Sequence, residues 1–302
     1  MSVPRRRHEL LHTRLERFTR TLPQVEAGDV RGVHHARVGS RRLRELIPVL
    51  QLEGNVAKRL NHRLRKATRR LGTLRELDVL LKLTAELRDG RRYPAGAVER
   101  VAAEVTRRRE KAGKKLPAAS TAEELRRLAR RLGKLERRLA AEPDDPRTQR
   151  RVWEWAVHAR VARRAAALKK AADSAGALYL AERLHAVRIA LKKLRYGVEL
   201  LDEAEGGTMR RELNTLKRVQ GLLGRLHDLQ VLVDQVRRIQ AALDPPDLLL
   251  WHDLSGLVTG LEQSGRRLHA RYVRERDGIL ELCHQFTVRA AAASRGAVRR
   301  AG

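Results

Sequence analysis

The chain has 302 residues, and 66 Lys and Arg against 36 Asp and Glu give it a net charge of +30. This length suggests about two domains. So large a positive surplus requires a polyanionic partner, which is nucleic acid, an anionic membrane surface or a polyphosphate. Arginine far outnumbers lysine, which favours phosphate because the planar guanidinium group bonds two oxygen atoms at once. The single cysteine, Cys283, excludes a disulfide framework within the chain.

The sequence contains no stretch that resembles a signal peptide or a membrane span. The N-terminal segment has cations followed by a helical apolar pattern, without a continuous apolar run or a small-residue cleavage site. No segment approaches the roughly 18 apolar residues that a bilayer span requires. We therefore expect a cytoplasmic protein with no membrane span.

Apolar residues recur at spacings of three and four along the whole chain, which predicts an all-α fold. Proline, glycine and acidic clusters divide this pattern into about eight helices, four in each half, and short connections favour antiparallel neighbours. We therefore predict one four-helix bundle over 1–145, a second over 146–288 and a disordered tail over 289–302. The predicted breaks are 23–32, 53–55, 90–94, 143–146, 174–176, 205–208 and 244–247, with a further interruption over 111–121.

Two segments of the first half occur again in the second half. VHHARVGSRRLRELIPVL at 33–50 corresponds to LHAVRIALKKLRYGVELL at 184–201, and LRKATRRLGTLRELDVLL at 64–81 corresponds to LKRVQGLLGRLHDLQVLV at 216–233. The spacing is too long for a solenoid repeat and indicates two related halves packed together. Pro48 interrupts only the first copy, so a kink there should be asymmetric.

Cations gather on one flank of each copy. On a helical wheel, the first copy places four of them within an arc of about 80° beside the apolar stripe. These four, His34, Arg37, Arg41 and Arg44, form a line along about 15 Å of helix, which we call the ladder. The helix that follows adds a second basic face, so that each half offers a groove suited to a linear anion. Arg42 and Lys193 point away from this ladder. The candidate contacts are His34, Arg37, Arg41, Arg44, Lys58, Arg65, Lys66 and Arg69, and in the second half His185, Arg188, Lys192, Arg195, Arg210, Lys217, Arg218 and Arg225.

These motifs, read as HHARVGSRRLR, LGTLRELDVL, HAVRIALKKLRY and LGRLHDLQVL, resemble those of the CHAD family, the conserved histidine α-helical domain. The resemblance covers about residues 5–288. It implies two pseudo-symmetric four-helix bundles around a basic central cavity, and binding of inorganic polyphosphate, often at polyphosphate granules with granule-associated proteins. The chain looks like the binding domain alone, without the triphosphate-hydrolysing domain of some members. One departure is that Glu45 stands where the second copy has Tyr196.

Other functions are less well supported by the sequence. HELLH at 8–12 matches a zinc-protease helix, but three arginines precede it and no third ligand is evident. Glu-x-x-His pairs lack the inward carboxylates of a di-iron site, and no clustered carboxylates are evident to hold magnesium for a phosphohydrolase. We therefore expect a non-enzymatic protein without a cofactor or metal. The alternative is a nonspecific nucleic-acid-associated protein, disfavoured because aromatic residues are only 3% of the chain and offer few stacking platforms.

Overall fold

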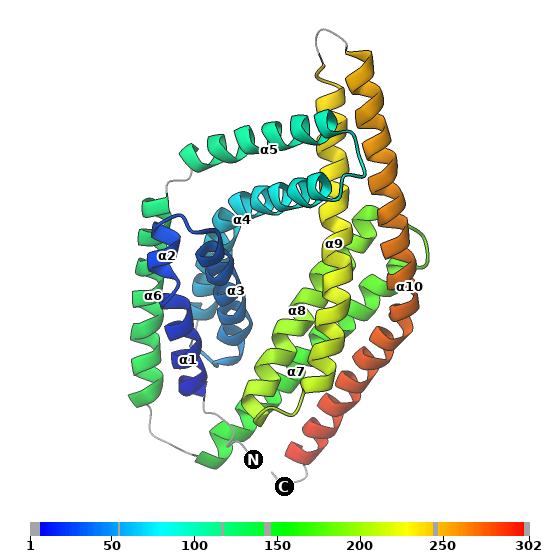
Figure 1. Ribbon diagram of the computed structural model, residues 1–302. Coiled ribbons are helices and arrows are strands. Elements are labelled where there is room, and N and C mark those ends of the chain that lie inside the picture. Colours follow the sequence, from blue (N-terminus) through cyan, green and yellow to red (C-terminus); the bar gives the residue numbers. More distant parts are fainter. Residues whose placement is uncertain (1–6, 54, 116–117, 142–145, 244–246, 299–302) are drawn as a thin grey trace.

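The computed structural model describes residues 7–53, 55–115, 118–141, 146–243 and 247–298. Within these residues it contains helices and no strand, which confirms the predicted all-α class. The first half holds α1 (Arg7–Thr19), α2 (Leu22–Glu26), α3 (Val30–Leu46), the 3-10 turn η1 (Ile47–Val49), α4 (Val56–Asp89), α5 (Ala95–Lys115) and α6 (Ala118–Ala141). The second half holds α7 (Pro146–Ala175), α8 (Ala181–Glu205), α9 (Arg210–Gln240) and α10 (Leu248–Val298) (Figure 1).

The predicted asymmetry at Pro48 is confirmed. Because proline removes a backbone donor and crowds the preceding turn, α3 ends at Leu46 and the chain continues through the 3-10 turn that contains Pro48. In the second copy α8 runs without interruption to Glu205 and ends at Gly206, whose φ of 81° is the left-handed conformation that glycine adopts easily.

Some expected breaks are helical instead. The segment 23–32 contains α2 and the start of α3, because a proline fits the first turn of a helix and the Asp29 carboxylate caps α3 by accepting from the Gly32 amide at 2.6 Å. The helix α5 continues through Gly113 to Lys115. The expected disordered tail 289–302 is helical as far as Val298. Expected features at 116–117, 142–145, 244–246 and 299–302 lie outside the described residues.

The buried apolar residues form two clusters, and both draw on the two halves of the chain. The larger joins α1–α3, the start of α4 and α6 to α7, α8, the start of α9 and the end of α10. The smaller joins the end of α4 and α5 to the end of α9 and the start of α10, and it includes Leu80, Val101, Leu232, Val236 and Leu257. The division into two bundles at residue 145 stays a prediction, and the hydrophobic packing crosses it.

Ion pairs connect α3 to the helices of the second half. Arg42 Nε lies 2.9 Å from Glu199 Oε2 on α8. Glu45 accepts hydrogen bonds from two arginines of α7, at 2.8 Å from Arg160 Nε and at 2.9 Å from Arg164 Nη2. These contacts hold α3 against α7 and α8, and so bring the two copies of the repeated segment together.

Candidate polyanion-binding site

Four cations from the two copies of the repeated segment lie close together. Arg37 and Arg41 come from α3, and Arg188 and Lys192 come from α8. Each side chain is partly buried. Arg41 lies near enough to the other three for its charge to lower their pKa values. We call these four residues the central cluster.

The central cluster has few partners of its own. Arg37 Nη1 donates to the Thr68 carbonyl oxygen at 3.3 Å, and Arg188 Nη2 lies 3.9 Å from Asp228 Oδ1 on α9. Among the described residues, Arg188 Nε is buried without a hydrogen-bond acceptor. Arg41 and Lys192 form no hydrogen bond or ion pair with any described residue. Because an unpaired charge is costly to bury, this arrangement favours an anionic ligand.

The cost of this arrangement is visible in the pKa values of the cluster. Burial, together with the charges of Arg188, Arg41 and Arg37, lowers the pKa of Lys192 to about 7. Burial and the charge of Arg41 lower the pKa of Arg37 to about 10. Burial also lowers the pKa of Arg188, against the opposing charge of Asp228. A bound polyanion would reverse these effects, because an adjacent negative charge favours the protonated form.

Histidines border the central cluster on both sides. Burial, and then neighbouring arginine charges, lower the pKa of His34 and of His185. His185 Nδ1 lies 3.3 Å from His227 Nδ1 on α9, and burial with the charge of Arg188 lowers the pKa of His227 to about 4. His227 is therefore neutral at pH 7, and a neutral imidazole can donate one hydrogen bond to a phosphate oxygen.

The model of the CHAD domain family matches residues 9–237. The chain belongs to the CHAD domain family. The family assignment made from the repeated motifs is therefore confirmed. No curated protein sequence matches the chain.

Two solved structures are similar to this CHAD chain. The CHAD domain from the plant Ricinus communis has 22% sequence identity and a TM-score of 0.62, over 94% of this chain and 93% of that chain. PptA from Streptomyces chartreusis has 18% identity and a TM-score of 0.57, over 95% of this chain and 98% of that chain. At these identities the similarity shows the fold alone.

Four polar residues beside the central cluster of this CHAD chain were not among the predicted contacts. They are Arg75 and Glu76 on α4, and His227 and Asp228 on α9. Arg75 helps to lower the pKa of His34, and Glu76 opposes the lowering at Arg188. Both pairs occupy the same two positions of the L-G-x-x-[RH]-[ED]-L motif. That repeated polar pair is the sequence signal from which a second polar wall could have been predicted, although it served above only for the family resemblance.

Most of the remaining predicted contacts divide into three groups. Arg44 and Arg65 lie near one another at the end of the ladder, where burial and then nearby charges, including that of Arg65, act on the pKa of Arg44. Arg218 pairs with Glu275 of α10, and Arg225 Nη1 lies 2.7 Å from Glu86 Oε2. The others are exposed on α4 and α9, and the structure does not link them to the central cluster; they are Lys58, Lys66, Arg69, Arg210 and Lys217.

Arg195 and Arg42 have structural partners. Arg195 is only 8% exposed. Its Nε donates to Gln220 Oε1 at 2.6 Å, and its guanidinium pairs with Glu199. The guanidinium also stacks on Tyr196, with Cζ 4.3 Å from the ring centroid. Arg42 also binds Glu199. Arg42 was expected to point away from the ladder, and it pairs with the buried Glu199, so a change of its charge would also remove an ion pair.

The exchange of Tyr196 for Glu45 in the first copy also has a structural reason. The Glu45 carboxylate is 6% exposed and is shared by Arg160 and Arg164 of α7. An aromatic ring at this position could not neutralise two partly buried arginines.

Outside the central cluster, His12 of the HELLH segment lies with its Nδ1 3.5 Å from Glu136 Oε1. No helix within the described residues is long and apolar enough to cross a membrane.

Proposed function

We propose that this CHAD chain binds inorganic polyphosphate without chemical turnover, through the central cluster. The observation that carries the proposal is the set of partly buried cations from α3 and α8, of which Arg41 and Lys192 have no partner among the described residues. A linear chain of phosphate groups supplies one charge after another to such a set. We further propose that the protein acts in the cytoplasm, at polyphosphate granules and beside granule-associated proteins.

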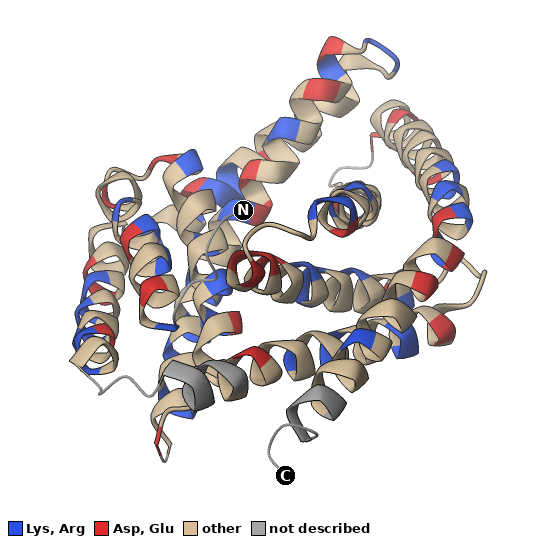
Figure 2. Cartoon of the chain, turned by 90° about the horizontal axis from the view of Figure 1, so that it is seen from below, with Lys and Arg blue, Asp and Glu red and all other residues tan. Residues whose placement is uncertain are grey.

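The character of the donors supports phosphate as the ligand. Arginine forms two parallel hydrogen bonds with phosphate oxygens, and charge-assisted bonds of this kind are about twice as strong as neutral ones. The buried Nε of Arg188 is a donor without an acceptor among the described residues. Lys and Arg are also spread along helices throughout the view in Figure 2, with Asp and Glu between them. We therefore assign specificity to the central cluster rather than to the net charge.

The proposal is tested by titrating the full chain with long-chain polyphosphate and with duplex DNA in one salt series, by calorimetry. We expect tight polyphosphate binding that weakens steeply as salt increases, because each phosphate contact releases counterions. Duplex DNA should bind more weakly at every salt concentration. Equal affinity for the two polymers would favour the nonspecific nucleic-acid function, and release of orthophosphate from the polymer would contradict binding without turnover.

A pair of variants tests the site itself. Neutralising the two partnerless cations with Arg41→Gln and Lys192→Met should cost about 3 kcal/mol of binding, or roughly a hundredfold in affinity. Arg137→Gln with Arg138→Gln is the matched control, since both arginines are exposed on α6 and form no ion pair with a described residue. Equal weakening by the control would show that net charge, and not the central cluster, determines binding.

A further inference from the structure

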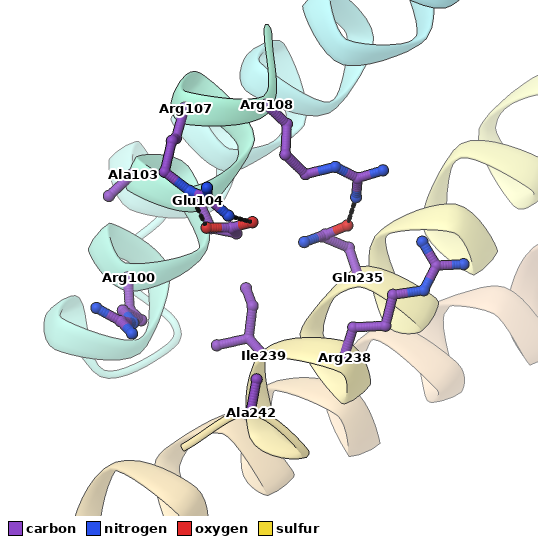
Figure 3. A pocket seen from close by; sticks show the side chains of 9 residues that line it. All are labelled: Arg100, Ala103, Glu104, Arg107, Arg108, Gln235, Arg238, Ile239 and Ala242. Atoms are coloured by element: carbon purple, nitrogen blue, oxygen red, sulfur yellow. Dashed lines mark hydrogen bonds and ion pairs between the residues drawn. The ribbon is translucent and has the colours of Figure 1, made fainter. Parts of the chain in front are cut away.

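A second basic site lies between α5 and α9, apart from the central cluster. The two helices line an open cavity of about 630 Å³ (Figure 3). Asp228 of α9 lies beside the central cluster. It is seven residues before Gln235 of the cavity, about 10 Å along the helix axis. None of the residues that line this cavity belongs to the contacts predicted from the repeated segments. Its polar lining consists of Arg100, Glu104, Arg107, Arg108, Gln235 and Arg238.

Four arginines and a single carboxylate line this cavity, and one arginine already satisfies the carboxylate. Glu104 accepts two hydrogen bonds from Arg107, at 2.9 and 2.8 Å. The Arg107 hydrogen bond, followed by the charges of Arg107, Arg108 and Arg100, lowers the pKa of Glu104. Glu104 therefore remains ionised and, among the described residues, is bonded by Arg107 alone, which leaves the lining with a surplus of positive charge.

Two of the four arginines have no protein partner. Arg100 and Arg238 form no ion pair or hydrogen bond with any described residue. The neighbouring Arg237 does have a partner, because its Nη2 lies 2.5 Å from Glu262 Oε1 on α10. Like charges gathered without counter-charges are unfavourable, so Arg100 and Arg238 are the residues of this cavity that an anion would stabilise.

A buried amide adds a directional donor to the cavity. Gln235 is 3% exposed, and its Oε1 accepts a hydrogen bond from Arg108. Its Nε2 group donates to no described residue. Ile239 and Ala242 line the same cavity beside it. An anion held against this wall would gain a neutral N–H donor besides the guanidinium groups.

We propose that this cavity binds a compact anion of two or three linked phosphate groups. Arg100 and Arg107 are seven residues apart, about 10 Å along α5, and Figure 3 shows Arg100 at one end of the cavity and Arg108 with Gln235 at the other. A short chain of phosphates is long enough to contact the groups at both ends of the cavity at once, whereas a single phosphate is not. The volume is that of a small-molecule pocket. Inorganic triphosphate and the phosphate tail of a nucleoside triphosphate share this chemistry.

The site is independent of the function proposed for the central cluster, and one calorimetric experiment separates the two. The full chain is titrated with inorganic triphosphate, and the unchanged protein should bind two equivalents. Arg100→Gln with Arg238→Gln should remove one equivalent, and Arg41→Gln with Lys192→Met should remove the other. Arg271→Gln with Arg274→Gln, two exposed positions of α10 without an ion-pair partner among the described residues, should leave both.

Each result decides one of the two sites. If the Arg100 and Arg238 variant still binds as many equivalents as the unchanged protein, the cavity between α5 and α9 is not a phosphate site, whatever happens at the central cluster. If that variant loses one equivalent while the Arg41 and Lys192 variant loses none, the second site stands and the function proposed for the central cluster fails. Loss of an equivalent in the α10 control would overturn the assignment to this cavity.

The source of the phosphate chain is decided by repeating the titration with ATP on the Arg41 and Lys192 variant. Binding at least as tight as that of inorganic triphosphate identifies a nucleotide site, in which the cavity accommodates the nucleoside as well. Binding more than tenfold weaker identifies a site for inorganic chains. The absence of binding by both anions would contradict the proposal.

Discussion

Lys192 is the residue whose charge is most sensitive to its surroundings. Its pKa of about 7 means that the free protein carries this charge on only about half of its molecules at neutral pH. In the unfolded chain the pKa of lysine is about 10.4. The native protein therefore binds fewer protons than the unfolded chain between these two values.

We predict two opposite pH effects at Lys192. Without ligand, stability should increase from about pH 7 to about pH 10, because over this range the unfolded state binds more protons. Affinity for polyphosphate should instead decrease by about tenfold from about pH 6 to about pH 9, because a bound anion requires the charged ammonium. Thermal unfolding at different pH values measures the effect on stability. Calorimetry in buffers of different ionisation enthalpy measures the effect on affinity and detects the uptake of a proton on binding.

Lys192→Met is the control for this prediction. It should flatten the increase in melting temperature with pH and remove the proton uptake. Proton uptake that persists in Lys192→Met would assign the titration to another group, such as His185, whose pKa is also lowered by burial and by Arg188.

The sequence predicted which cations share a helix face but not which of them have partners. Arg37, Arg41, Arg188 and Lys192 followed from the helical wheel and lie together as expected. Arg195 occupies an equivalent ladder position and is nevertheless held by Gln220 and Glu199. The difference depends on side chains of the neighbouring helix, and the periodicity of one segment does not show which residues another helix brings to it.

The contact of α3 with α4 positions Arg37. Its guanidinium lies against Gly72, where an added Cβ would be 2.6 Å from Nη1. At the corresponding position of α9, Gly224, an added Cβ meets nothing within 4 Å. The repeat therefore contains two glycines of which only the first makes room for a binding residue.

We predict that Gly72→Ala weakens polyphosphate binding by about tenfold, or about 1.4 kcal/mol, because the Arg37 guanidinium must move from its hydrogen bond with Thr68. Gly224→Ala is the matched control. It should leave binding unchanged and should stabilise α9 by up to about 1 kcal/mol, since alanine favours a helix over glycine. Calorimetry and chemical denaturation measure these effects, and equal affinity of the two variants would contradict the role assigned to Gly72.

At the level of elements, the repeat and the apolar spacing predicted α3, α4, α8 and α9 well. The ends of the helices were less predictable, because a glycine or proline only permits a break. Gly113 lies within α5, and Pro23 lies in the first turn of α2. Packing against other helices decides between these outcomes.

In the molecule as a whole, one buried carboxylate links α3 of the first half to α7. Glu45 is shared by Arg160 and Arg164 at hydrogen-bond distance. We predict that Glu45→Gln destabilises the chain by about 3 kcal/mol, because two partly buried arginines lose their counter-charge. Chemical denaturation measures this loss.

Glu123→Gln is the comparison for Glu45→Gln. Glu123 also accepts from two arginines, Arg127 and Arg130, but on the exposed surface of α6, where water screens the charges. Its effect should be much smaller. Similar destabilisation by both substitutions would show that the contact between the halves does not depend on the Glu45 pairs.

The hydrophobic cluster shared by α4, α5, α9 and α10 also affects the order in which the chain can fold during synthesis. Val105 is the last residue that the first half contributes, and Leu229 is the first contributed by α9. At about 5–20 residues per second, a ribosome needs about 6–25 s to make the intervening segment. For that time the apolar faces of α4 and α5 can pack on one another but lack their partners from α9 and α10, and a chaperone that shields the uncovered part would increase the yield of native protein.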